Sequence, residues 1–341
     1  MKRVRRAIQW LLPALASIGS VLDSLIEWMK RMPRTIQWLL PALVSIGVLG
    51  LLLARSDVDL LDVLRSIDSE AALGLVPPLL AFGVASLALE ALSLVRTVER
   101  PLALWTAARI KAASYLAYTL HYTLGVATLT VLLRRRVGLS LGDSAGVVLL
   151  IAGFDLGVAL VLLMASAGLS QTEAPGLRLG LVAAIVLVIP AGFWLLRTPR
   201  NLGPLERARD LAVFRAARNA SPRVLCELLF LRTLFSITFI ALVSGALRAF
   251  DLAAPVSEVI MNSLLVALVA ALPIAVAGIG TGNAAFVFLF RDHGDPETLL
   301  ACSLALSAGM IMLRAGIGIS FAGEFAREAM AAVRRGESEQ A

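Results

Sequence analysis

A succession of apolar runs, each close to the length of a membrane span, dominates the sequence. About 20 apolar residues in a helix cross the hydrocarbon core of a bilayer, and lipid admits only helices and closed barrels as spanning structures. Hydrophobic residues make up 59% and charged residues 16% of the 341 residues, whereas soluble domains are about half apolar and a quarter charged. The sequence therefore predicts an all-α polytopic membrane protein without a soluble catalytic domain.

About six of these runs are predicted to cross the membrane completely. Basic segments and acidic connectors flank them on alternate sides, and basic flanks belong in the cytoplasm. This rule places both termini and the basic loop 197–223 in the cytoplasm, and the integral domain 35–323 in the cytoplasmic membrane. Residues 324–341 then form a cytoplasmic tail. The predicted spans are residues 36–54, 71–95, 144–168, 177–196, 224–247 and 298–322.

Two further apolar runs, 101–134 and 258–290, begin and end on the same predicted side of the membrane. The second is longer than the ~20 residues of a span, and Pro273 and several glycines interrupt it. Proline and glycine weaken a helix, and irregular backbone at membrane depth needs a cover of protein or water. Both runs are predicted to form re-entrant broken-helix hairpins. For residues 258–290, a single kinked helix with glycines for close packing is the alternative.

The same order of span, hairpin and span occurs in residues 71–168 and again in residues 224–322. The predicted orientation of the second unit is opposite to that of the first. Such an inverted repeat is typical of transporters, which bind their substrate near the membrane midplane between broken helices. The spacing therefore predicts an inverted repeat with a site between its two halves.

Residues 1–34 are predicted to form an N-terminal interfacial segment. Residues 8–19 recur with one change at 36–47, which indicates a local duplication. Asp23 and Glu27 shorten the apolar stretch of the first copy, so an amphipathic helix at the membrane surface is expected there. A cleaved signal peptide is not expected, because no small-residue cleavage site leads into a polar chain.

Several segments together resemble one known family. Residues 273–280 read Pro-Ile-Ala-Val-Ala-Gly-Ile-Gly and resemble the Pro-Ile-Ser-x-Gly-Gly-Leu-Gly signature of the lysylphosphatidylglycerol synthase transmembrane-region family. That family includes the flippase half of the multiple-peptide-resistance factor. The resemblance extends over about residues 36–325 and implies a lipid-translocating membrane domain. Its further matches are Gly125–Leu129 and Arg134–Leu141 for the first hairpin and its loop, Leu313, Arg314 and Gly323 for the last span, and Asp155 for a frequent aspartate.

The chain departs from the family pattern at charged positions. Gly282 and Asn283 stand where the second hairpin of the family has arginine and glutamate. In the first hairpin, Val126 replaces a glutamate, Leu129 replaces an arginine, and His121 stands at or near a proline. The sequence therefore resembles a divergent member, either with another substrate or without transport activity.

The break in the second hairpin is the first candidate for a binding site. The N-terminus of a half-helix carries unpaired N–H groups and partial positive charge, and glycines let an anion approach the backbone. A lipid phosphate is the expected anion, with Thr281 or Asn283 as the cap of the second half-helix. A glycine-lined packing seam is the alternative. The candidate residues are Pro273, Gly278, Gly280, Thr281, Gly282 and Asn283.

Two charges lie deep in predicted spans, where isolated charges are costly. Asp155 and Arg314 occupy equivalent spans of the two repeats, so they are predicted to pair or to face one cavity. The alternative is an ion pair that only fixes helix register. Glu90, Glu227 and Arg232 lie nearer the cytoplasmic ends and are predicted to be snorkelling or capping residues.

The first hairpin supplies further candidates. Tyr115, Tyr118 and Tyr122 share one helical face, and His121 and Gly125 lie at the predicted break. His121, Tyr122 and Gly125 are therefore candidate headgroup contacts. A packed aromatic seam is the commoner explanation for such a face.

These observations favour a lipid translocase that moves an anionic phospholipid or polyprenyl-linked lipid. A non-transporting partner of a lipid-modifying synthase or glycosyltransferase is the first alternative, and an ion-coupled small-solute transporter is the second. Catalytic, metal and cofactor sites are not expected, because no nucleophile, paired-carboxylate or metal-ligand pattern is present. Membrane lipids with anionic headgroups are the expected partners and nucleic acid is not. The sequence leaves a homo-oligomer open.

Overall fold

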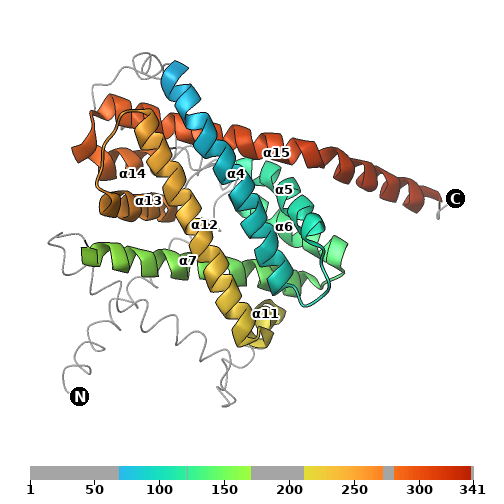
Figure 1. Cartoon of the computed structure of the whole chain (residues 1–341). Helices are drawn as coiled ribbons and strands as arrows, with labels where there is room; N and C mark the ends of the chain where they lie inside the picture. The colour runs from blue at the N-terminus through green and yellow to red at the C-terminus, as the bar shows by residue number, and fades with distance from the viewer. Residues whose placement is uncertain (1–68, 121, 170–210, 272–279, 339–341) are drawn as a thin grey trace, which may run out of the picture.

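The computed structural model describes residues 69–120, 122–169, 211–271 and 280–338, and these contain helices and no strand. Four helices are long and apolar enough to cross a membrane (Figure 1). The prediction of an all-α, multi-pass membrane protein is confirmed for this part of the chain. The four helices are α4 (Ser69–Thr97), α7 (Leu141–Leu169), α12 (Pro222–Ala249) and α15 (Pro296–Ser338).

Each of these helices contains one predicted span. Helix α15 continues beyond the predicted span without a break, and its last turns extend away from the bundle (Figure 1). The predicted spans 36–54 and 177–196 lie outside the described residues, as do the N-terminal segment and most of the basic loop. The count of about six spans therefore stays a prediction.

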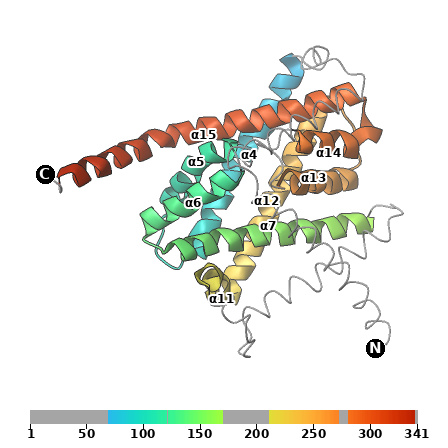
Figure 2. The ribbon, with the colours of Figure 1, turned by 180° about the vertical axis from the view of Figure 1, so that it is seen from behind.

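The two predicted hairpins correspond to two pairs of short helices. The first pair is α5 (Leu104–Leu120) and α6 (Tyr122–Val137). The second pair is α13 (Val256–Ala271) and α14 (Thr281–Phe290). Within each pair the helices contact each other, and the two pairs lie at opposite ends of the bundle (Figures 1 and 2).

Helices α4 and α12 pack against each other, and α7 and α15 cross this pair well apart from one another (Figures 1 and 2). Small residues let α4 and α12 approach closely. A Cβ atom on Gly245 would lie 2.7 Å from the Cβ atom of Pro78, and one on Gly74 would lie 3.2 Å from that of Ala249. Van der Waals packing of this kind holds helices together in lipid, where burial from water no longer drives their contact.

Two apolar cores flank the α4–α12 pair. One joins α4 and α12 to α14 and α15, and the other joins α4 to α5, α6 and α7. Side-chain hydrogen bonds close the outer end of the second pair. Asn262 donates to the carbonyl oxygen of Leu289 at 2.8 Å, and Glu258 lies 2.6 Å from His293. His293 belongs to η3 (Arg291–His293), which leads from α14 to α15.

The remaining described elements are η2 (Ala212–Phe214) and α11 (Arg215–Asn219), which pack against the start of α7. Arg215 forms an ion pair with Asp143 at 2.9 Å. This contact holds the end of the basic loop beside the first turn of α7.

We expect Gly245→Ala to destabilise the protein by about 1–3 kcal/mol, because the new methyl group overlaps Pro78 and forces α4 and α12 apart. Thermal unfolding in detergent measures the effect. Gly153→Ala is the matched control, since nothing lies within 4 Å of a Cβ atom there. Equal unfolding temperatures for the two variants would contradict the importance of this contact.

We expect the cap of α15 to weaken in acid. The backbone N–H of Thr298 donates to Asp295 at 2.8 Å, and this bond lowers the pKa of the Asp295 carboxyl. Because the pKa of Asp295 is lower in the folded protein than in the unfolded chain, where it is about 3.9, the cap stabilises the protein fully at a pH above the unfolded pKa. This stabilisation is lost as the pH falls through the folded pKa. Asp295→Ala should therefore cost about 1 kcal/mol at pH 7 and clearly less near pH 3. A difference that does not change with pH would contradict this assignment.

Candidate functional site

Two ion pairs within the apolar helices link the long helices to their neighbours, and three of their four side chains are largely buried. Lys111 Nζ on α5 lies 2.9 Å from Glu90 Oε1 on α4. Arg232 Nε on α12 lies 2.6 Å from Asp155 Oδ1 on α7. The side chain of Arg232 is only 1% exposed. Charges inside a membrane protein are costly unless they are paired, so each pair fixes which helix faces meet.

The Asp155–Arg232 contact is a charge pair rather than a well-aligned hydrogen bond. Asp155 Oδ1 and Arg232 Nε lack a hydrogen-bond partner of good geometry in the described residues despite their closeness. The guanidinium carbon of Arg232 also lies 4.2 Å from the ring centre of Phe235. The cation is therefore stabilised by a carboxylate and by an aromatic face.

Aromatic residues complete the surroundings of Glu90. The hydroxyl of Tyr115 donates to Glu90 Oε2 at 2.5 Å, and Lys111 Nζ lies 4.8 Å from the ring centre of Tyr118. Both carboxylate oxygens of Glu90 thus have a partner. Burial of this carboxylate is stabilised by one cation and one neutral donor.

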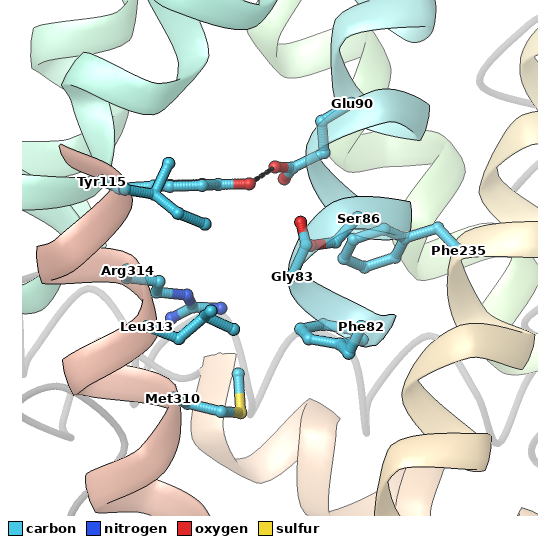
Figure 3. Close-up of a pocket in the computed structure, with 10 residues that line it drawn as sticks. Phe82, Gly83, Ser86, Glu90, Tyr115, Phe235, Met310, Leu313 and Arg314 are labelled. Carbon is cyan, nitrogen blue, oxygen red and sulfur yellow. Dashed lines mark hydrogen bonds between the residues drawn. The ribbon is translucent and has the colours of Figure 1, made fainter. Parts of the chain in front are cut away.

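A small pocket opens beside this cluster, between α4, α5, α12 and α15 (Figure 3). Its polar lining consists of Ser86, Glu90, Tyr115 and Arg314, and the guanidinium group of Arg314 points into the space between α15 and α4. The other lining residues are Phe82, Gly83, Phe235, Met310, Leu313 and Ile317. An apolar wall with a few convergent polar groups is the usual form of a small-molecule site.

The predicted pairing of Asp155 with Arg314 is wrong. Asp155 pairs with Arg232 and is not among the residues that line the pocket, whereas Arg314 does line it. The reason is the arrangement of the helices, since α7 and α15 cross the α4–α12 pair well apart from each other (Figures 1 and 2).

The prediction that Glu90 and Arg232 are snorkelling or capping residues is also wrong. Both are enclosed by neighbouring helices, and each has a partner of opposite charge on another helix: Lys111 for Glu90 and the half-exposed Asp155 for Arg232. Glu227 does lie near a helix end, where it contacts Arg223 at 3.0 Å and Arg96 at 3.5 Å. Sequence reasoning did not identify Lys111 as the partner of Glu90. The sequence did contain a signal for this pair: the acid Glu90 and the base Lys111 lie in apolar runs that follow each other in the chain.

The described residues of the second hairpin form a helix cap rather than part of the pocket. Asn283 Oδ1 accepts from the backbone N–H of Gly280 at 2.9 Å, so the expected cap by Asn283 is present. Its amide nitrogen donates to Ser303 and Ser307 on α15 at 3.2 and 3.1 Å. Asn283 therefore ties α14 to α15.

The other candidates at this break have different roles. Gly280 has a φ of 94°, a value that favours glycine. Thr281 Oγ1 is buried and has no hydrogen-bond partner in the described residues. Gly282 is in ordinary contact with Ala270, 3.5 Å from a Cβ atom built on it. Pro273 and Gly278 lie outside the described residues.

In the first hairpin, Gly125 packs against the ring of Tyr118, where a larger residue would overlap the ring. His121 and the side chain of Tyr122 lie outside the described residues. It is Tyr115 that lines the pocket. Within the described ranges, no three His, Cys, Asp or Glu side chains are grouped as a metal site would require.

Comparison with known proteins identifies a family whose sequence pattern matches most of the helices described above. The pattern of the family described as the lysylphosphatidylglycerol synthase TM region matches residues 38–318. The match contains both ion pairs and every residue that lines the pocket. No curated protein matches the chain.

We expect Glu90→Gln to destabilise the protein by about 3–5 kcal/mol, because Lys111 is left as an uncompensated buried charge. The double variant Glu90→Gln with Lys111→Met should recover most of this loss. Thermal or denaturant unfolding in detergent measures both. Arg223→Gln is the control, since Arg223 is 85% exposed in its pair with Glu227, and a surface pair contributes at most about 1 kcal/mol. A single variant as stable as the wild type would contradict a structural role for the buried pair.

Proposed function

The chain belongs to the lysylphosphatidylglycerol synthase transmembrane-region family, and from this we propose that it is a lipid translocase. It moves an anionic phospholipid or polyprenyl-linked lipid between the leaflets of the cytoplasmic membrane. The observation that carries the proposal is the pocket between α4, α5, α12 and α15, which has charged groups within apolar helices. Ionisable residues inside membrane helices are rare and mark pathways for substrates or ions.

The lining of the pocket suits a lipid headgroup. Arg314, Glu90, Ser86 and the hydroxyl of Tyr115 supply polar contacts, and the aromatic and aliphatic residues opposite them suit the glycerol and the first methylenes. The two ion pairs hold the surrounding helices in register. A headgroup can therefore enter a polar region without the helices separating.

The helix contacts support the proposed inverted repeat of two re-entrant hairpins. Helices α4, α5, α6 and α7 correspond in order to α12, α13, α14 and α15. Exchanging the two sets leaves the pattern of neighbours unchanged: α5 contacts α15 as α13 contacts α7, and α7 contacts α12 as α15 contacts α4. The first helices of the two sets, α4 and α12, contact each other. This relation is what a two-fold repeat requires.

Alternating access follows from such a repeat when one half moves against the other around a fixed site. The pocket has lining residues from both halves, since Glu90 and Tyr115 belong to the first, and Phe235 and Arg314 to the second. Movement at the α4–α12 contact would open the pocket towards one leaflet and then the other. The close glycine contacts described above are the surface on which the halves would slide.

A non-transporting partner of a lipid-modifying enzyme is the second candidate. One observation favours it: Asn283, which stands in place of a charged residue of the family pattern, uses its amide to join α14 to α15. In that function the second hairpin is a structural element, and the basic loop is the surface available to the enzyme.

We expect purified full-length protein in vesicles to exchange fluorescent phosphatidylglycerol between leaflets, and Gly83→Leu to lower this rate at least about tenfold. Gly83 lines the pocket, and a Cβ atom there would already lie 2.8 Å from Leu313, so a leucine fills the space that a headgroup needs. A dithionite-quenching assay measures the exchange.

Gly153→Leu is the matched control, because no atom lies within 4 Å of a Cβ atom at that position. Unfolding temperature and gel filtration establish that each variant is folded. Absence of exchange by folded wild-type protein with every lipid tested would reject the translocase and favour the partner function. Copurification with membrane-bound synthases would then follow.

A further inference from the structure

The side chains in and around the pocket include more positive than negative charges. The carboxylate of Glu90 is paired with Lys111, and that of Asp155 is paired with Arg232. Arg314 is the fifth charge and forms no ion pair with an acidic residue in the described ranges. The cluster therefore has one excess positive charge, and the group that bears it points into the pocket (Figure 3).

We infer that the pocket selects a headgroup with a single phosphodiester anion and no amine, and that Arg314 binds the phosphate. The inference rests on the proposed function, because it names the class of lipid that this site takes. A guanidinium group presents parallel N–H donors that match two phosphate oxygens, and such charge-assisted pairs are among the strongest hydrogen bonds in proteins.

The other polar groups of the pocket explain why Arg314 remains available. Glu90 is the acid in the pocket that could pair with Arg314. Its Oε1 atom already faces Lys111 and its Oε2 atom accepts from Tyr115, so its charge is already neutralised. The hydroxyl of Ser86 donates to the carbonyl oxygen of Gly83 at 3.2 Å. Arg314 is thus the lining residue whose donors are free to bind an anion, within the part of the chain that the structure describes.

The same arrangement disfavours a headgroup that contains an ammonium group. The added ammonium cation would lie near Lys111 and Arg314, and the repulsion of like charges is strong where water is scarce. Among the described residues, Glu90 is the one acid that lines the pocket, and its charge is already balanced. Phosphatidylglycerol fits these conditions, whereas phosphatidylethanolamine and a lysyl-bearing lipid do not.

The test measures binding to the full chain in an uncharged maltoside detergent. The probes are dihexanoyl-phosphatidylglycerol, dihexanoyl-phosphatidylethanolamine and inorganic phosphate, and the readouts are the shift in unfolding temperature and the dissociation constant. The variants are Arg314→Gln, Arg314→Lys and, as a control, Arg248→Gln at an exposed arginine near the end of α12. Each is checked for folding by gel filtration and circular dichroism.

We expect phosphatidylglycerol to stabilise the wild type and the Arg248 control. Arg314→Gln should bind it at least about tenfold more weakly, which corresponds to about 1.4 kcal/mol, and Arg314→Lys should lie between the two. Equal binding of phosphatidylglycerol by Arg314→Gln and the wild type would overturn the inference. Equal stabilisation by phosphatidylethanolamine would overturn the selectivity, and equal stabilisation by inorganic phosphate would overturn the assignment to a lipid.

Leaflet exchange with the same variants separates this inference from the proposed function. Binding that depends on Arg314, without exchange by the wild type, would support the headgroup site and reject the translocase. Exchange by the wild type together with equal exchange and equal binding by Arg314→Gln would support the translocase and reject the headgroup site.

Discussion

The pairing of buried charges is the constraint on which the arrangement of the helices depends. A charge within a membrane helix must find a partner of opposite sign or a polar cavity. Lys111 pairs with Glu90, and this ion pair holds the first pair of short helices, α5 and α6, against α4. Arg232 pairs with Asp155, which holds α7 against α12. With these faces fixed, Arg314 lies beside the pocket without an acidic partner among the described residues.

Small residues complement the charged pairs by letting helix backbones approach. Gly245 faces Pro78 between α12 and α4, Gly309 faces Leu79 between α15 and α4, and Gly318 faces Leu116 between α15 and α5. In lipid, helix association depends on van der Waals packing and polar contacts rather than on the burial of apolar surface from water. The glycines therefore determine how closely the helices approach, and the ion pairs determine which faces meet.

The two sets of helices, α4–α7 and α12–α15, make matching contacts but differ in their charged residues. Each short-helix pair meets the last long helix of the other half, yet the charged pocket lies beside the first pair. The second pair instead has a neutral connection, in which Asn283 caps α14 and binds two serines of α15.

The sequence by itself determined the membrane class and the long helices, and it limited the cap of α14 to Thr281 or Asn283. These features depend on local chemistry: apolar length, and a polar side chain close to a helix start. Only the tertiary structure decided that Asp155 meets Arg232, that Lys111 is a buried partner of Glu90, and that Arg314 faces a pocket. Ion-pair partners depend on which helix faces approach each other. Close contacts between residues far apart in the chain fix those faces, and no local spacing encodes them.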